Sequence, residues 1–247
     1  GLWKASEIVS LGSEIDSTMF REIKWIGGRG NSGIYKVQMN CNRVAALKIY
    51  VQESKHNRLH SEYEGLRLLN EVGLTDIPRP IGCNQSLGVA LYDWIEGEII
   101  EKPKGNDIDR ALFLVEQLYE VRLSESWMLF PKASAATFSG QDLEEQIKYR
   151  FESLVTYGSS STELLNYLHT ELKPIIDEIV EWGRFSWPIK EQYRDELSLN
   201  ARTLSPSDFG FHNALKKNMN GKITFIDFEY FGWDDPVKLA SDFYWHP

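Results

Sequence analysis

The sequence has few cysteines and no long apolar run. Cys41 and Cys83 are the only two cysteines in 247 residues, too few for a disulfide framework, so we expect a reducing compartment. No apolar stretch approaches the roughly 20 residues that a membrane span needs. The first ten residues, GLWKASEIVS, lack the basic start and the apolar stretch of a signal peptide. These absences predict a cytoplasmic protein with no membrane partner.

Clusters of positive charge are also missing. The formal net charge is −9, and no run of lysine and arginine has the density of a basic face. Because polyanion binding depends on such a face, we expect no nucleic-acid partner. The acidic balance leaves two interpretations open, a cationic small-molecule substrate or solubility alone.

The first part of the chain has a β-type pattern. Apolar and polar residues alternate over 21–51 and again over 88–95, which predicts strands, and the segment 56–72 predicts one amphipathic helix. The polar segment 95–109 contains glycine and proline and is the predicted junction between two lobes. The pattern therefore predicts a β-rich N-terminal lobe over residues 1–95.

The rest of the chain has a mostly helical pattern. Helices are expected over 107–123, 141–156 and 162–183, and a hairpin that turns at Asn220-Gly221 is expected over 214–231. The apolar face predicted for the first helix consists of Leu112, Val115, Leu118 and Tyr119. The pattern predicts a helical C-terminal lobe over residues 96–247 that carries a catalytic loop and a substrate pocket.

A glycine-rich stretch, GGRGNSGIYKV, lies early in the chain. Its candidate phosphate-binding residues are Gly28, Gly30, Ser32 and Gly33. Dinucleotide-binding loops share this glycine spacing but open a helix, whereas IYKVQM here has a strand pattern, and the chain has no Walker sequence. A strand, glycines and a second strand are typical of a hairpin whose backbone N–H groups cover phosphates. A plain hairpin turn is the alternative.

Two charged residues follow where such a phosphate hairpin needs partners. Lys48 lies in the apolar strand VAALKIY, where burial without a counter-ion would be costly. A kinase lysine of this kind holds the nucleotide's phosphates and is itself held by a glutamate on the next helix. Glu62 borders the apolar face of that helix and Glu64 does not, so we expect Glu62 to be the partner. The alternative is that both charges face solvent.

The strongest pattern is SPSDFGFHNAL followed by ITFIDFEYFGWDDP. Asp208 and Asn213 stand five positions apart on a loop, and Asp227 ends an apolar run fourteen positions after Asn213. Phosphoryl transfer needs a carboxylate that accepts the proton of the hydroxyl, and oxygen ligands for Mg²⁺. Asp208 is therefore the candidate catalytic base, and Asn213 and Asp227 are candidate magnesium ligands. Asp and Asn also favour turns, and that interpretation stays open.

Over most of its length the chain resembles the aminoglycoside phosphotransferase and choline kinase-like family, the small-molecule branch of the protein-kinase fold. The resemblance is carried by GGRGNSG, AALKIY, SEYEGLRLL, ALYDWIEGE, SPSDFGFHNAL and IDFEYFGWDDP. It implies an α+β, bilobal protein-kinase-like fold whose N-terminal lobe is an antiparallel sheet with one main helix. It also implies ATP and Mg²⁺ as cofactors, and an interlobe connection over Tyr92, Trp94 and Ile95 whose backbone meets adenine.

The chain departs from the family's pattern at three places. Pro206 stands where the family usually has a histidine two positions before the catalytic aspartate, which bears on the geometry of that loop. Leu239 stands where an aspartate is expected shortly after the Asp-Pro pair. The sequence ends at Pro247, whereas the family has further helices, so we expect part of the acceptor pocket to be missing.

The expected activity is ATP-dependent transfer of the γ-phosphate to a hydroxyl of a small molecule, such as an aminoglycoside, an amino alcohol or a sugar-like acceptor. A kinase-like module that binds nucleotide without turnover is the alternative, and a protein kinase ranks last because no A-P-E-like segment is present. Six acidic residues on the later helices could contact an amine or form a solvated face. They are Asp142, Glu144, Glu145, Asp177, Glu178 and Glu181.

Overall fold

The computed structural model describes residues 15, 20–28, 32–40, 42–51 and 56–245. Over these residues the chain is an α+β protein that packs as two compact units. One unit consists of Gly1–Ala135 with Thr203–Pro247, and the other of Ala136–Arg202. The lobe boundary predicted after residue 95 lies inside the first unit and stays a prediction. None of the helices in the described ranges is long and apolar enough to cross a membrane.

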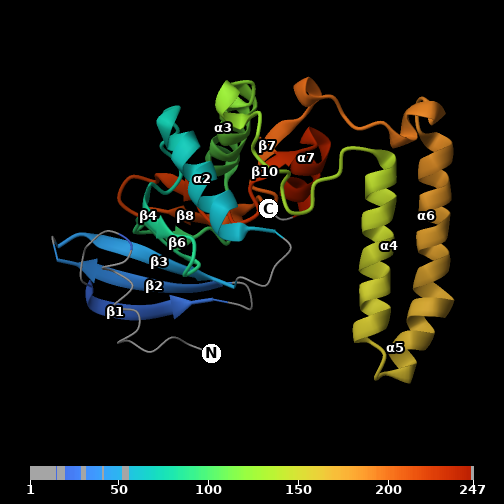
Figure 1. Cartoon of the computed structure of the whole chain (residues 1–247), viewed down its shortest axis with the longest axis horizontal. Helices are drawn as coiled ribbons and strands as arrows, with labels where there is room; N and C mark the ends of the chain where they lie inside the picture. Colours follow the sequence, from blue (N-terminus) through green and yellow to red (C-terminus); the bar gives the residue numbers. More distant parts are fainter. Residues whose placement is uncertain (1–14, 16–19, 29–31, 41, 52–55, 246–247) are drawn as a thin grey trace. The chain divides into compact units, whose positions relative to one another are not determined.

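The first unit contains a five-stranded antiparallel sheet in the order β1-β2-β3-β5-β4 (Figure 1). Its strands are β1 (Phe20–Gly27), β2 (Ser32–Met39), β3 (Val44–Tyr50), β4 (Pro80–Asn84) and β5 (Val89–Asp93). The strands predicted over 21–51 and 88–95 are therefore present. The pattern did not predict β4, whose sequence PIGCN holds residues that are rare in strands. Proline is tolerated there because β4 is an edge strand.

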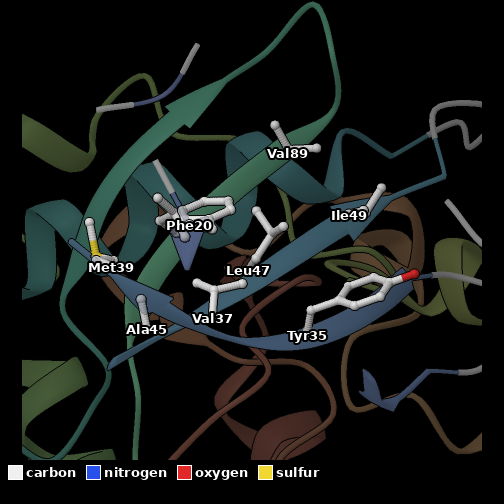
Figure 2. Close-up of a cluster of buried hydrophobic side chains, with 9 residues drawn as sticks. Phe20, Tyr35, Val37, Met39, Ala45, Leu47, Ile49 and Val89 are labelled. Atoms are coloured by element: carbon white, nitrogen blue, oxygen red, sulfur yellow. The ribbon is translucent and has the colours of Figure 1, made fainter. Parts of the chain in front are cut away.

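One face of this sheet forms a hydrophobic core. Side chains alternate across a strand, so every second residue of β2 and β3 points to the same face. The buried cluster consists of Phe20, Tyr35, Val37, Met39, Ala45, Leu47, Ile49, Val89 and Leu91 (Figure 2). A one-residue slip of β3 would expose its members of the cluster, so the cluster specifies the register. That register places Ile34 and Ala90 beside Lys48, and the side chain of Lys48 on the opposite face.

Helix α2 (Arg58–Glu71) follows β3 and lies against β4 and β5. It begins at Asn57, whose side chain accepts a hydrogen bond from the backbone N–H of His60. The helix buries Leu59, Leu66 and Leu69, and with them the charged residue Glu62. The predicted helix is thus present, and its buried face carries one carboxylate toward the sheet.

Small strands, two α-helices and two short 3-10 helices complete the described part of the first unit. They are β6 (Glu98–Ile99), α3 (Gly105–Val121), η1 (Glu125–Trp127), β7 (Thr203–Ser205), η5 (Phe211–Asn213), β8 (Ala214–Lys216), β9 (Ile223–Phe225), β10 (Gly232–Asp234) and α7 (Pro236–Trp245). Strand β7 pairs with β10, and β6, β8 and β9 form a three-stranded sheet. The predicted hairpin is the β8–β9 pair, with Gly221 at φ +65° in its turn.

The apolar face predicted for α3 is wrong in part. Leu118 is buried as expected, but Leu112 and Tyr119 are 49% and 47% exposed. The buried face contains Asp107, whose carboxylate accepts hydrogen bonds from the Lys216 ammonium and from the Lys104 backbone. A carboxylate with an ion-pair partner can be buried on the core side of a helix. The buried face of α3 therefore includes Asp107 and differs from the face predicted from the apolar residues alone.

The second unit is built on a helical hairpin. Its elements are α4 (Gly140–Tyr157), α5 (Thr162–Tyr167), the π-helical turn η2 (Leu168–Leu172), α6 (Lys173–Ser186), η3 (Lys190–Arg194) and η4 (Leu199–Ala201). Helices α4 and α6 lie side by side, with α5 at the turn between them (Figure 1). The helix predicted over 162–183 is thus present as α5, η2 and α6 in succession.

Candidate active site

Lys48 lies at the centre of a buried cluster of charges in the first unit. Its side chain extends from β3 and the residue is 5% exposed. Its Nζ lies 2.7 Å from Glu62 Oε2 and 2.5 Å from Asp227 Oδ1. A third carboxylate, that of Glu229, lies 3.1 Å from the same nitrogen. The structure thus brings together Lys48, Glu62 and Asp227, which belong to three separate sequence motifs.

Opposite charges compensate the burial of this cluster. Burial lowers the pKa of Lys48, but the carboxylates of Glu62 and Asp227 outweigh that effect and hold its pKa above the ordinary value. Burial raises the pKa of Glu62, and the contact with Lys48 opposes the shift. Removing one partner would leave a buried charge uncompensated, which is strongly destabilising. The cluster therefore favours the charged form of the Lys48 ammonium on the face of the sheet opposite the core.

Glu62 is fixed by donors from two other parts of the chain. Its Oε2 accepts hydrogen bonds from Lys48 and from the Tyr50 hydroxyl, both at 2.7 Å. Its Oε1 accepts one from the backbone N–H of Phe228 at 3.3 Å. The Tyr50 hydroxyl lies 2.7 Å from that of Tyr92 on β5. The carboxylate therefore links α2 to β3 and to the segment that follows Asp227.

Glu229 was not predicted from the sequence. It is 3% exposed, and its Oε1 lies 3.8 Å from the Arg58 Nε. Its buried Oε2 has no hydrogen-bond donor among the described residues, although the ammonium of Lys48 lies near it. The only sequence signal was a second carboxylate two positions after Asp227. Ligand oxygens of Glu62, Asp227 and Glu229 lie within 4.8 Å of one another, and carboxylate oxygens are the donors that Mg²⁺ prefers.

Asp208 lies on an ordered loop between β7 and η5. Its side chain is 47% exposed, so a solute can reach the carboxylate. The preceding residue, Ser207, has φ +68°, a left-handed conformation that is uncommon outside glycine. The buried hydroxyl of Ser205 accepts a hydrogen bond from the Ser207 backbone N–H at 2.9 Å. This hydrogen bond spans Pro206. It holds Ser207, the residue directly before Asp208, in its strained conformation.

Asn213 and His212 contact the same carboxylate. The Asn213 Nδ2 donates to the Asp208 carbonyl at 2.9 Å and lies 3.4 Å from its Oδ2, which leaves the Asn213 Oδ1 as the atom that can face a cation. The His212 Nε2 lies 3.1 Å from the Asp208 Oδ1. In the structure, the His212 ring therefore contacts the carboxylate of Asp208, the candidate base.

The β8–β9 hairpin brings Asn213 and Asp227 to one end. Asn213 directly precedes β8, and Asp227 lies just beyond β9. The backbone N–H of Ile226 donates to the Asn213 carbonyl at 2.8 Å, which extends the ladder by one bond. Asp227 has φ +66°, a second non-glycine residue in the left-handed region. Strained backbone of this kind occurs often at functional sites, where the surrounding structure maintains it.

The predicted phosphate loop is described only in part. Gly30 lies outside the described residues. Gly28 follows β1 with φ +156°, and a Cβ there would lie 2.2 Å from the Ser32 carbonyl oxygen. Ser32 and Gly33 are the first residues of β2, so the glycine stretch does join two antiparallel strands. Glycine is required at position 28 by the close approach of the backbone.

The predicted adenine-binding connection begins inside β5. Tyr92 is a buried residue of that strand and pairs with Ala46. Trp94 and Ile95 follow its end, and the Trp94 indole N–H donates to Glu96 at 2.7 Å. The Lys36 ammonium lies 4.4 Å from the centre of the Trp94 ring. Tyr92, at the start of this connection, and Lys48 therefore lie on neighbouring strands of one sheet.

The six acidic residues of the later helices belong to the second unit and are mostly engaged within it. Glu144 is buried, and its carboxylate accepts from Arg184, Lys148 and Tyr193. These donors lower the pKa of Glu144 to about 2. Asp142 accepts from the Phe138 backbone N–H at the start of α4, and Asp177 pairs with Lys173. Glu144 therefore joins α4 to α6 and η3.

Two histidines lie near the start of α2, His56 just before the helix and His60 in its first turn. The His56 ring contacts the Ser61 hydroxyl at 3.0 Å, and the His60 ring stacks on Phe130 with centroids 5.9 Å apart. Among the residues that the structure describes, the group of possible metal ligands around Lys48 contains carboxylates and no histidine.

Comparison with known proteins supports the fold. No family model matches the chain, and no curated protein sequence matches it. Solved structures do match the chain. One is an amicoumacin kinase in complex with AMP-PNP, Ca²⁺ and Ami, which gives a TM-score of 0.59 at 13% identity over 98% of this chain and 68% of that one. A choline kinase from Cryptosporidium parvum Iowa II gives a TM-score of 0.60 at 16% identity over 90% of this chain and 62% of that one.

An aminoglycoside phosphotransferase from Alicyclobacillus acidocaldarius matches as well, with a TM-score of 0.54 and 13% identity over 98% of this chain and 70% of that one. This chain spans less than two thirds of the choline kinase. At such low identity the likeness concerns the fold, and it confirms the resemblance expected from the motifs at that level. The chain has the kinase-like fold of the aminoglycoside phosphotransferases and choline kinases.

Proposed function

We propose that the protein transfers the γ-phosphoryl group of ATP to a hydroxyl of a small molecule. One observation carries the proposal: the Lys48 ammonium, on the sheet, contacts both Glu62 on α2 and Asp227 at the end of the β8–β9 hairpin. A lysine held in this way can bind phosphates while the hairpin supplies oxygen ligands for a metal ion. The kinase-like fold supports the same chemistry by analogy.

The reaction assigns one role to each group. The acceptor oxygen forms a bond to the γ-phosphorus, the bond from that phosphorus to the β,γ-bridging oxygen breaks, and ADP leaves. Asp208 orients the acceptor hydroxyl and accepts its proton. Lys48 binds the phosphates, and Glu62 holds Lys48. Mg²⁺, when bound, neutralises charge on the phosphate oxygens.

Other chain segments hold the cofactors. Asn213 and Asp227 would hold Mg²⁺ through their side-chain oxygens, and the carboxylate of Glu229 lies close to that of Asp227. The backbone of Gly28, Gly30, Ser32 and Gly33 would cover the phosphates. The backbone of the connection from Tyr92 through Trp94 to Ile95 would contact adenine. We propose a small-molecule acceptor, and a cationic one suits the net charge of −9.

The test is turnover of Mg·ATP against a panel of amino alcohols, aminoglycosides and sugars, with the mass of each product measured. We expect an ATP-dependent gain of one phosphoryl group on a hydroxyl. Asp208→Asn should lower kcat by about 10²- to 10⁴-fold, the range for general-base catalysis, while nucleotide binding is retained. Binding of ATP by the wild type without turnover of any panel member would favour a nucleotide-binding module instead.

A further inference from the structure

A pair of buried tyrosines lies behind the Lys48 cluster. Tyr50 is 5% exposed and Tyr92 is 4% exposed, and they come from β3 and β5. Their hydroxyl oxygens lie 2.7 Å apart, and the Tyr50 hydroxyl lies 2.7 Å from the Glu62 Oε2. The function proposed above assigns no role to either hydroxyl.

The direction of these hydrogen bonds follows from the chemistry of the groups. An ionised carboxylate only accepts, so the Tyr50 hydroxyl must donate to Glu62. Its proton is then committed, so Tyr50 can only accept from the Tyr92 hydroxyl. Burial and the nearby Glu62 keep the pKa of Tyr50 well above its ordinary value, so it retains the proton that it donates. These two hydrogen bonds form a relay, in which the Tyr92 hydroxyl donates to Tyr50 and the Tyr50 hydroxyl donates to Glu62.

The relay ends on the same carboxylate oxygen of Glu62 that accepts a hydrogen bond from Lys48. Glu62 Oε2 accepts from both Lys48 and Tyr50, at 2.7 Å each. Lys48 also has Asp227 at 2.5 Å and Glu229 at 3.1 Å. If Glu62 turned away, the ammonium would be left with the carboxylates beside the proposed metal site. A donor that fixes Glu62 therefore keeps Lys48 from being drawn wholly toward Asp227.

We propose that Tyr50, supported by Tyr92, is a positioning residue that fixes the Glu62 carboxylate and through it the phosphate-binding ammonium of Lys48. This inference rests on the proposed phosphotransferase function. The relay also connects β5, which leads into the proposed adenine-binding connection, to the lysine that binds phosphate. Chained hydrogen bonds polarise one another, so Tyr92 contributes although it does not touch Glu62.

The test removes single hydroxyls and retains the rings. In Tyr50→Phe we expect kcat for Mg·ATP turnover to fall about 10-fold, as for the loss of one hydrogen bond to a charged group, with a smaller change in the KM for ATP. Tyr92→Phe should show a smaller loss of about 2- to 3-fold, because Tyr50 still donates to Glu62. Tyr35→Phe is the matched control, since Tyr35 is a buried tyrosine on the opposite face of the same sheet (Figure 2).

A double-mutant cycle separates positioning from general support of the fold. In a Glu62→Gln background, Tyr50→Phe should lower kcat no further, because its effect passes through Glu62. An equal loss in both backgrounds, or wild-type kcat in Tyr50→Phe, would overturn the inference and leave the phosphotransferase function intact. A wild type that neither binds nor turns over Mg·ATP would overturn the proposed function, and the inference with it.

Discussion

The Nζ of Lys48 lies 2.5 Å from the Oδ1 of Asp227, although 179 positions of sequence separate the two residues. Without nucleotide, the carboxylate proposed to bind the metal is therefore neutralised by the ammonium proposed to bind phosphate. Bound Mg·ATP would replace this ion pair with two new ones, in which the metal faces Asp227 and the phosphates face Lys48. Lys48 and Asp227 would thus each have an oppositely charged partner in both states.

Asp227→Asn should weaken the response to magnesium. The neutral amide is a poorer ligand for a hard cation, so we expect the Mg²⁺ concentration for half-maximal activity to rise. We expect kcat to fall by roughly two orders of magnitude, which corresponds to about 3 kcal/mol. Asp109→Asn, an exposed carboxylate on α3, is the control. Turnover that is unchanged in Asp227→Asn across a magnesium titration would refute the assignment of Asp227 as a metal ligand.

Ser205→Ala should disturb the loop that carries Asp208. The lost hydroxyl is the acceptor for the backbone N–H of Ser207, which has φ +68°. We expect kcat to fall about 10-fold and the unfolding free energy to fall by about 1–2 kcal/mol, because a buried N–H loses its partner. Both are measured with purified variants by steady-state kinetics and urea denaturation, with Ser241→Ala on α7 as an exposed control. If kcat does not change, Ser205 does not hold the loop.

Gly65→Ala should destabilise the protein although alanine favours helices. A Cβ at Gly65 would lie 2.5 Å from the ring of Phe231, which is fully buried. Overpacking of this kind costs about 1–3 kcal/mol, more than the helix propensity gain of about 1 kcal/mol. The shift of α2 should also lower kcat, because Glu62 lies one turn away.

Gly183→Ala supplies the matched control for that substitution. Gly183 is also within a helix, α6, and a Cβ there would meet nothing within 4 Å. This variant should therefore be more stable than the wild type by about 0.5–1 kcal/mol. Thermal unfolding of both variants checks the pair, and a stabilised Gly65→Ala would show that α2 does not pack tightly against Phe231.

Glu144→Gln should destabilise the helical unit in a pH-dependent way. The folded pKa of Glu144 is lowered from 4.5 to about 2, so its ionised form stabilises the fold above pH 4.5. That contribution is lost as the pH falls from 4.5 toward 2. The variant should therefore be less stable than the wild type by about 1–3 kcal/mol at pH 7, for the loss of hydrogen bonds to a charged group, and the difference should shrink at pH 3.

Urea denaturation at the two pH values measures this difference. Glu145→Gln is the control, because Glu145 is the exposed neighbour on α4 and accepts a hydrogen bond from Gln141 of the same helix. A difference between Glu144→Gln and the wild type that stays constant from pH 7 to pH 3 would contradict the lowered pKa.

The sequence by itself determined the strand and helix periods, and with them most of the fold. Alternation predicted β1–β3 and β5, and the glycine at position 221 predicted the turn of the β8–β9 hairpin. It also singled out Lys48 in an apolar strand, Glu62 at the border of the apolar face of the next helix, and Asp227 at the end of an apolar run. These are local patterns, which a sequence records directly.

Only the tertiary structure decided which charges meet. Glu229, the Tyr50–Tyr92 relay and the Ser205 contact with Ser207 depend on the register of the sheet and on the packing of α2. Long-range packing also buried Asp107, which lies outside the apolar face predicted for α3, and engaged Glu144 within the helical unit. Hydrogen bonds act over about 3 Å, so they exist only after distant segments have been brought into contact.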